Sequence, residues 1–268
     1  MAKRPVITLL TDFGTKDPYV ACMKGVILRI CPEAAIVDIT HEIPKFDVRT
    51  GAFTLYQAVP YFPDGAIHVA VVDPGVGTAR RGIVVKTERS VLVGPDNGLL
   101  ILAARREGML TAYEITNRKL MLPNPSHTFH GRDVFAPVAA HIACGVPPET
   151  VGPPVRELIE PSFVRPTFDG GVIRGEVIHV DGFGNVVSNI PGELLKQAGI
   201  CFGDWVRVRS PGKEVRVRLC RTYGEVGVGI PLALVGSHGF LEVSINQGNA
   251  GKVFNFKVGD KVEVSRVG

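Results

Sequence analysis

The first half of the chain alternates between two hydrophobic patterns. Short runs rich in Val, Ile and Leu predict buried strands at 5–11, 34–40, 66–73, 82–94 (two strands around a tight turn) and 111–116. Between these runs, apolar residues recur at helical spacing and predict helices at 18–30, 48–59, 97–107 and 131–144. Repeated β–α alternation predicts an α/β domain with a mainly parallel sheet flanked by helices.

The pattern changes after Cys144. Six prolines within 145–166 indicate a segment with little regular structure, and short apolar runs beyond it are interrupted by Gly, Asn and Pro. Their spacing predicts a smaller all-β domain of antiparallel strands, which we expect to be barrel-like. The expected division is an α/β domain over 1–150, a linker over 151–171 and an all-β domain over 172–268.

Composition narrows the classes of function. Of 268 residues, 45% are hydrophobic and 21% charged, and the net charge of +4 forms no basic stripe, so no nucleic-acid partner is expected. The five cysteines include no C-x-x-C pair, which argues against a disulfide framework and a thiolate zinc site. The sequence contains no run of 18 apolar residues, and its first apolar run is too short to predict a secretion signal. We therefore expect a cytoplasmic protein without a membrane partner.

Two acidic residues follow predicted strands. Asp12 ends the first strand, and Asp73, within VVDPGVGTARRG, ends the third. Ligands of α/β sheets bind at the carboxyl ends of strands, so both acids are candidate site residues, although either could simply stabilise a turn. The glycines lack G-x-G-x-x-G spacing, and a strand rather than a helix follows them, so a phosphate loop is disfavoured. They favour a tight loop that brings Asp73 together with either Arg80 or Arg81.

A second polar cluster is SHTFHGRD at 126–133. Its His127 and His130 could bind a metal, cap the helix that follows, or orient and deprotonate a water molecule beside Asp73. The residues alone leave these alternatives open. In the second half of the chain, HVDGFGNVVSN and GSHGF are typical of turns when each is taken singly.

Together, the motifs resemble a known family. TDFG, DPGVGTARR, PDNGLL, TFHGRD, DGFGNVVSN and GSHGFLE occur in this order between Val6 and about Val264. The order is similar to that of the S-adenosyl-L-methionine (SAM) hydroxide adenosyltransferases, adenosine-forming SAM hydrolases related to the fluorinase and chlorinase. The resemblance implies an α/β domain, a smaller β domain and a homotrimer with active sites at subunit interfaces. It also implies metal-independent hydrolysis of SAM to adenosine and L-methionine, by in-line attack of water on C5′, without a cofactor.

The resemblance implies roles for individual residues. Asp12 matches the acid that binds the two ribose hydroxyls, a task that suits a carboxylate because it accepts two hydrogen bonds. Asp73, Arg80 and His130 match the catalytic group around the attacking water, which selects the first of the two arginines and the second of the two histidines.

Further positions match residues that bind the remainder of the substrate. They are Asp17, Tyr19, Thr128, Phe129, Asp181, Phe183, Asn185, Ser237 and His238. Asp17 matches an acid that contacts the methionine amine in the halogenases. His238 stands where the halogenases have arginine.

Three other functions compete with SAM hydrolysis. A halogenase needs a dry halide pocket, but where the fluorinase has Tyr, Thr and Ser this chain has Asp73, Val76 and Gly131, and the charge of Asp73 would repel a halide. A metal-dependent hydrolase could instead be built from Asp12, Asp73, Asp96 and His130. A non-catalytic SAM or nucleoside sensor would bind without turnover. In the cell, hydrolysis could clear a damaged or epimeric form of SAM, or remove excess SAM.

Overall fold

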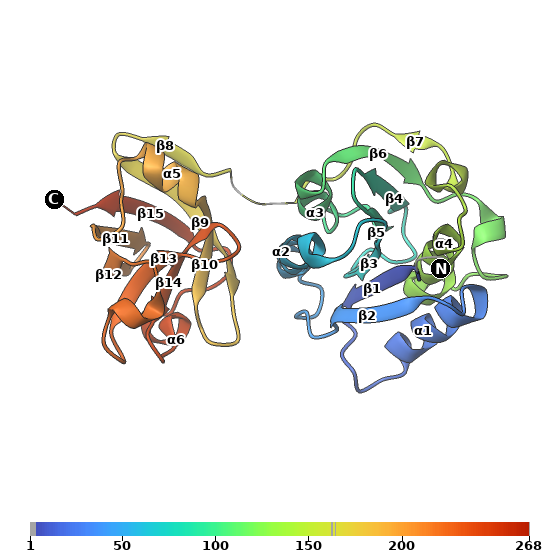
Figure 1. Cartoon of the computed structure of the whole chain (residues 1–268), viewed down its shortest axis with the longest axis horizontal. Helices are drawn as coiled ribbons and strands as arrows, with labels where there is room; N and C mark the ends of the chain where they lie inside the picture. The colour runs from blue at the N-terminus through green and yellow to red at the C-terminus, as the bar shows by residue number, and fades with distance from the viewer. Residues whose placement is uncertain (1–3, 162, 164, 268) are drawn as a thin grey trace. The chain divides into compact units, whose positions relative to one another are not determined.

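The computed structural model describes residues 4–161, 163 and 165–267. The chain divides into two compact units, residues 1–162 and 163–268, which are drawn in Figure 1. Each unit has its own sheet and its own hydrophobic core. No helix of the described residues is long and apolar enough to cross a membrane.

The first unit is built on a seven-stranded sheet with the order β2-β1-β3-β5-β4-β6-β7. Its strands are β1 (Val6–Thr11), β2 (Ala35–Thr40), β3 (Ile67–Val71), β4 (Gly82–Thr87), β5 (Val91–Pro95), β6 (Met109–Glu114) and β7 (Pro154–Val155). The four strands from β2 to β5 are parallel, and β4, β6 and β7 continue the sheet with antiparallel pairing.

Helices cover the two faces of this sheet (Figure 1). The helix α1 (Tyr19–Ile30) packs on α4 (Ala136–Ala143), and α2 (Val48–Ala58) packs on α3 (Ile101–Arg106). Apolar residues of α1 and α4, including Met23 and Ile27, are buried against alternate residues of β1 and β3. This is the burial that the helical spacing of apolar positions predicts.

The α/β class is confirmed, and the antiparallel part of the sheet has a local cause. The tight turn between β4 and β5 forces these two strands into a hairpin, and a hairpin is antiparallel by construction. The helix expected at 97–107 is shorter, because residues 97–100 form a turn ahead of α3. The helix expected at 131–144 begins as a one-turn π-helix (Gly131–Phe135) before α4 continues it.

The second unit is a closed barrel of seven strands. They are β9 (Val172–Val180), β10 (Val186–Pro191), β11 (Trp205–Ser210), β12 (Lys213–Leu219), β13 (Pro231–Val235), β14 (Phe240–Ile245) and β15 (Lys261–Arg266). The barrel closes because β9 pairs with both β15 and β10, and a short strand, β8 (Thr167–Asp169), pairs with β9 outside the ring. All these pairs are antiparallel except β12 with β13.

The barrel core follows the alternation of the strand sequences. Val206 and Val208 of β11, like Val262 and Val264 of β15, are buried, while their neighbours face outward. Two short helices, α5 (Gly192–Gln197) and α6 (Ala250–Phe254), connect the strands. The barrel-like all-β domain expected from the sequence is confirmed, and closure of the ring leaves its strands without a free edge.

The expected linker at 151–171 contains ordered contacts at its start. The strand β7 lies within it and extends the first sheet. Farther along, the backbone N–H of Ile159 donates to Asp96, and Arg105 pairs with Glu160. Residues 162 and 164 of this segment lie outside the described residues.

Candidate active site

Two acids meet at one edge of the first sheet. The parallel pairing of β1 with β3 sets Thr11 opposite Val71, so the residues that follow these strands emerge side by side. Asp12 and Asp73 follow them, and both line a pocket of about 340 Å³. The two acids that follow the strands therefore line one cavity at this edge of the sheet.

Asp73, Arg80 and His130 form a hydrogen-bonded cluster at this pocket. Arg80 Nε donates to Asp73 Oδ1 at 3.1 Å, and Arg80 Nη2 donates to Asp73 Oδ2, so the guanidinium binds both carboxylate oxygens. Arg80 Nη2 also lies 3.1 Å from Nδ1 of His130. The side chains of Asp73 and Arg80 are only 5% and 7% exposed, which shields the ion pair from water.

The contact with Arg80 determines where His130 carries its proton. A guanidinium can only donate, so Nδ1 of His130 accepts and the ring proton resides on Nε2. Burial and the positive charge of Arg80 lower the pKa of His130 below its ordinary value. His130 is thus a neutral ring at neutral pH, with Nε2–H as a hydrogen-bond donor.

Asp73 is shifted in the opposite direction. Burial raises its pKa above that of an ordinary aspartate, although the charge and hydrogen bonds of Arg80 act to lower it. A carboxylate with a raised pKa takes up a proton more readily than an ordinary one. This is the property that a general base requires.

The loop that carries Arg80 is held close to the histidine segment by a glycine. Gly77 has a φ of +77°, and a Cβ at this position would lie 2.3 Å from the backbone oxygen of His127. Only glycine tolerates both the positive φ and the close approach. The glycines of DPGVGTARRG therefore shape a loop around the cluster rather than a phosphate site.

Among the described residues, no histidine side chain of the SHTFHGRD segment caps the helix that begins at Gly131. Instead, buried Asp133 binds Arg132 Nε at 2.6 Å and the backbone N–H of Ser126 at 2.8 Å. These contacts brace the segment from within, and Asp133 is buried rather than on the surface.

Arg81 points to a different partner from Arg80. Its Nε and Nη2 donate to Asp96 Oδ2 at 3.0 and 2.5 Å, and Nη2 also donates to the backbone oxygen of Glu157 at 2.7 Å. The other oxygen of Asp96 accepts from the backbone of Ile159. Arg81 and Asp96 therefore fix the chain that leaves the sheet, and neither belongs to the cluster.

The remaining predicted residues of the first unit line the same pocket as Asp12 and Asp73. They are Asp17, Tyr19, Thr128 and Phe129. The rings of Tyr19 and Phe129 meet edge to face with centroids 5.2 Å apart, and Phe13 lies 5.7 Å from each of them. These aromatic rings give one wall of the pocket an apolar surface.

Two residues that the sequence analysis did not single out, Lys45 and Phe46, also line this pocket. Lys45 Nζ donates to the backbone oxygen of Asp12, and the backbone N–H of Phe46 donates to Asp12 Oδ2 at 2.8 Å. Phe46 has a φ of +65°, rare for an aromatic residue, and its side chain is 68% exposed. Their place after β2, on the same sheet edge, was the signal available in the sequence.

A second pocket reaches the cluster from another side. It has a volume of about 390 Å³, and Arg80 and His130 contribute to its lining. Polar and charged residues surround it, among them Thr78, Thr116, Arg118 and His127. Of the cluster, Asp73 lines only the pocket of Asp12, Arg80 lines only this second pocket, and His130 lines both.

The second unit has a pocket of about 730 Å³ that includes three predicted residues, Asp181, Phe183 and Asn185. Asp181 Oδ1 accepts from the backbone of Phe183 and of Asn185, and its Oδ2 accepts from Asn185 Nδ2 at 2.9 Å. The DGFGN motif is thus a turn between β9 and β10, and the turn itself presents Phe183, 82% exposed, to the pocket. Residues not foreseen from the sequence complete the lining, including Tyr223, Asn246, Gln247 and Asn249.

Ser237 and His238 lie in the turn between β13 and β14, outside the residues that line this pocket. His238 Nδ1 accepts from the backbone of Phe240 at 3.1 Å, and Nε2 lies 3.2 Å from Glu242 Oε2. Burial alone would raise the pKa of Glu242, but hydrogen bonds from His238, Ser244 and Tyr223 hold it below its usual value. Both ring nitrogens of His238 are therefore engaged within the barrel.

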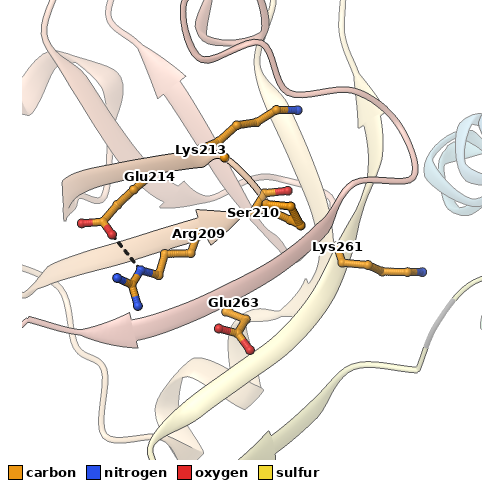
Figure 2. A pocket seen from close by; sticks show the side chains of 8 residues that line it. Arg209, Ser210, Lys213, Glu214, Lys261 and Glu263 are labelled. Atoms are coloured by element: carbon orange, nitrogen blue, oxygen red, sulfur yellow. Dashed lines mark hydrogen bonds and ion pairs between the residues drawn. The ribbon is translucent and has the colours of Figure 1, made fainter.

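A further pocket, of about 590 Å³, lies beside the β11–β12 hairpin and β15 (Figure 2). Its charged side chains are already in ion pairs: Arg209 with Glu214, Lys213 with Asp260, Lys261 with Glu176 and Glu263 with Arg174. Figure 2 shows Lys213 and Lys261 extending away from Glu214. These side chains do not converge on a common point, so the pocket is a poor candidate for an active site.

The carboxylates of the metal alternative have other partners. Asp73 binds Arg80, and Asp96 binds Arg81. Within the part of the chain that the structure describes, no group of three or more His, Cys, Asp or Glu residues is arranged to hold a metal ion. The geometry instead provides a carboxylate, a guanidinium and a neutral imidazole, which together can hold and deprotonate a small nucleophile.

Comparison with known proteins agrees with this site. The SAM hydroxide adenosyltransferase N-terminal domain matches residues 7–152, and the C-terminal domain of the same family matches 175–263. An (R)-S-adenosyl-L-methionine hydrolase from Salinispora tropica is 44% identical, over 99% of each chain. A fluorinase from an Actinoplanes species is 30% identical, over 98% of each chain.

A solved structure has the same fold. The crystal structure of an uncharacterized conserved protein from Thermotoga maritima superposes with a TM-score of 0.92 and 44% identity, covering 97% of this chain and all of that one. Two family domains together span most of the sequence, and the relatives are matched over nearly their whole length, which leaves one assignment. The chain belongs to the SAM hydroxide adenosyltransferase family.

Proposed function

We propose that this protein hydrolyses SAM to adenosine and L-methionine. The observation that carries the proposal is the Asp73–Arg80–His130 cluster, whose Asp73 and His130 line the same pocket as Asp12. The relatives at 44% identity are named as hydrolases of the R sulfonium epimer, so we extend the proposal to that epimer. Clearance of an epimer that forms from SAM is then the cellular role to test.

The reaction is an in-line displacement. The water oxygen forms a bond to C5′ of SAM, the C5′–sulfur bond breaks, and its electron pair neutralises the sulfonium, so methionine leaves as a thioether. The leaving group needs no protonation, and the protein has to align the water with C5′. Such alignment contributes on the order of 7–11 kcal/mol in favourable cases.

The proton of the attacking water goes to Asp73. Its raised pKa favours proton uptake, whereas Nδ1 of His130 is occupied by Arg80 and its Nε2 already carries a proton. His130 is therefore a hydrogen-bond donor to the nucleophile, and Arg80 holds the carboxylate in place. The proposal thus assigns the role of base to Asp73, a choice between Asp73 and His130 that the sequence alone left open.

The other predicted residues bind the substrate in this proposal. Asp12 accepts hydrogen bonds from the ribose hydroxyls, and the pocket residues Asp17, Tyr19, Thr128 and Phe129 surround the remainder. The residues of the barrel that complete the site are Asp181, Phe183, Asn185, Ser237 and His238. Because the two sets lie in separate units, we propose a homotrimer in which one subunit's first unit and its neighbour's barrel form each active site.

Halide transfer is the alternative that the fluorinase relatives raise. By the resemblance, Asp73 stands at a position that belongs to the halide pocket in the fluorinase, and a carboxylate there repels a halide. Hydrolysis is therefore favoured. The proposed mechanism involves no cofactor. The cysteines of the protein are free, which is consistent with the proposed cytoplasmic location.

Product chromatography after incubation with each SAM epimer tests the proposal. We expect adenosine and methionine from the R epimer, in the same amounts with a chelator or with added halide. The Asp73→Asn variant should retain SAM binding and lose on the order of 10²–10⁴ in kcat. A 5′-halogenated product would support the halogenase, chelator sensitivity a metal enzyme, and binding without products a sensor.

A further inference from the structure

The pocket of Asp12 and Asp73 is lined by more acidic than basic side chains. Three carboxylates line it, those of Asp12, Asp17 and Asp73, and Lys45 is the one Lys or Arg among its described lining residues. Asp73 is matched by Arg80, which leaves two acids and one ammonium group available to a ligand.

This set complements the charges of SAM. The substrate carries two positive groups, the sulfonium and the α-ammonium, and one negative group, the α-carboxylate. A pocket that offered only acids would leave the carboxylate without a partner, and an unpaired charge is costly to desolvate. Lys45 supplies the positive group that the carboxylate requires.

The position of Lys45 is fixed relative to the ribose site. Its Nζ donates to the backbone oxygen of Asp12, and the next residue, Phe46, donates its backbone N–H to the Asp12 side chain. An ammonium group has three donors, so two remain for a ligand. By contrast, His238 uses both ring nitrogens inside the barrel.

We infer that Lys45 binds the α-carboxylate of the methionyl group and so makes the enzyme specific for sulfoniums that carry an amino acid. The inference rests on the proposed function, because it takes SAM as the ligand. It assigns to Lys45 a specificity role and no part in bond breaking. Loss of the contact should therefore raise KM and leave kcat nearly unchanged.

The test compares SAM with decarboxylated SAM, the same sulfonium without the carboxylate. In Lys45→Met, kcat/KM for SAM should fall about 10- to 100-fold, the loss expected for a charged hydrogen bond, and kcat/KM for decarboxylated SAM should stay close to wild type. Lys45→Arg should retain most of the preference for SAM. Lys16→Met is the matched control, since Lys16 is exposed, lies near Asp17 and is not part of the lining.

Binding measurements separate the inference from the proposed function. Calorimetry should measure the binding of SAM and of decarboxylated SAM to the Asp73→Asn variant, with and without the additional Lys45→Met substitution. Lys45→Met should remove the preference for SAM in binding, as it does in kcat/KM. If wild-type protein bound but did not hydrolyse SAM, and Lys45→Met removed the preference, the proposed function would fail and the inference would stand. An unchanged preference in Lys45→Met, or an equal loss in Lys16→Met, would overturn the inference.

Discussion

The adjacent arginines Arg80 and Arg81 bind different partners. Arg80 binds both oxygens of Asp73 and the ring of His130, whereas Arg81 binds Asp96 and the backbone of Glu157. Two neighbouring residues of a loop point in different directions, so one serves the cluster and the other the chain beyond the sheet.

This contrast predicts opposite effects of the same substitution. Arg80→Lys removes the two-pronged contact with Asp73 and should lower kcat about 100-fold, as for loss of an oriented transition-state contact, with little change in stability. Arg81→Lys should leave kcat nearly unchanged and lower the free energy of unfolding by about 1–2 kcal/mol. Steady-state kinetics and urea unfolding of both variants check this, and equal loss of kcat in the two would contradict it.

The pKa directions predict the shape of the pH profile. Asp73 must be ionised to take the proton, and its pKa is raised, so kcat should fall with decreasing pH at a midpoint above that of an ordinary aspartate. His130 has a lowered pKa and is already neutral, so it should add no step near pH 6.5. Measuring kcat from pH 4 to 9 checks the prediction, with thermal unfolding at each pH as a control. A step near pH 6.5 would show that His130 titrates in the working range.

At the scale of residues, the sequence was most informative where a residue follows a strand. Asp12 and Asp73 could be found because acids at parallel strand ends share an edge. The choice of Arg80 over Arg81 needed the family resemblance, since loop geometry is not encoded in a local pattern. Lys45 and Phe46 were missed because they follow β2 without glycines or a motif, and only the positive φ of Phe46 marks the place.

At the scale of elements, the loop between β3 and β4 depends on its contact with the histidine segment. The backbone of Gly77 lies against that of His127, whereas a Cβ on Gly75 would meet only ordinary contacts at 3.6 Å or more. The two glycines therefore have different tolerances, although both belong to the same short motif.

We expect Gly77→Ala to be severe and Gly75→Ala to be mild. In Gly77→Ala, the positive φ and the clash with a backbone oxygen force the two loops apart, which should cost about 1–3 kcal/mol of folding free energy and lower kcat. Gly75→Ala should retain most of both. Thermal unfolding and kinetics on the two variants test this, and a fully active Gly77→Ala would contradict the proposed role of the loop contact.

Helices and strands with a single clear period of hydrophobic positions were predicted well, and the exceptions have physical causes. Strands β1 and β3 and helices α1 and α2 lie close to their expected bounds because each buries one face or both. Strand β2 also lies close to its expected bounds, although its residues are half-buried or exposed rather than buried as expected. The pairing direction beyond β5 could not be predicted from burial alone, because buried parallel and antiparallel strands have similar composition. The π-helix at Gly131–Phe135 was also beyond reach, since a wide turn has no distinct hydrophobic period.

At the scale of the whole molecule, the change of hydrophobic pattern after Cys144 correctly predicted a second unit of a different fold class. The predicted binding residues are divided between the units, with Asp12 and the cluster in one and the DGFGN turn in the other. Each set is incomplete by itself in the proposed mechanism. The proposed homotrimer would therefore make assembly of subunits a condition of activity rather than an addition to it.

Mixing two inactive variants tests this dependence. Asp73→Asn damages the first unit and Asn185→Ala the barrel, and co-refolding them in equal amounts should restore activity if each site combines two subunits. Random assembly would regenerate about a quarter of the sites. Light scattering should give the mass of a trimer, and activity that remained zero in verified mixed trimers would place each site within one subunit.

The second cavity behind Arg80 and His130 has a consequence for solvation. A fluoride ion must shed tightly held water before it can attack carbon, and a nucleophile reached from two sides keeps part of its hydration. In the proposed hydrolysis, the same opening offers water a route to His130, which lines both cavities. The rear cavity thus suits a hydrated reaction centre and opposes a dry one.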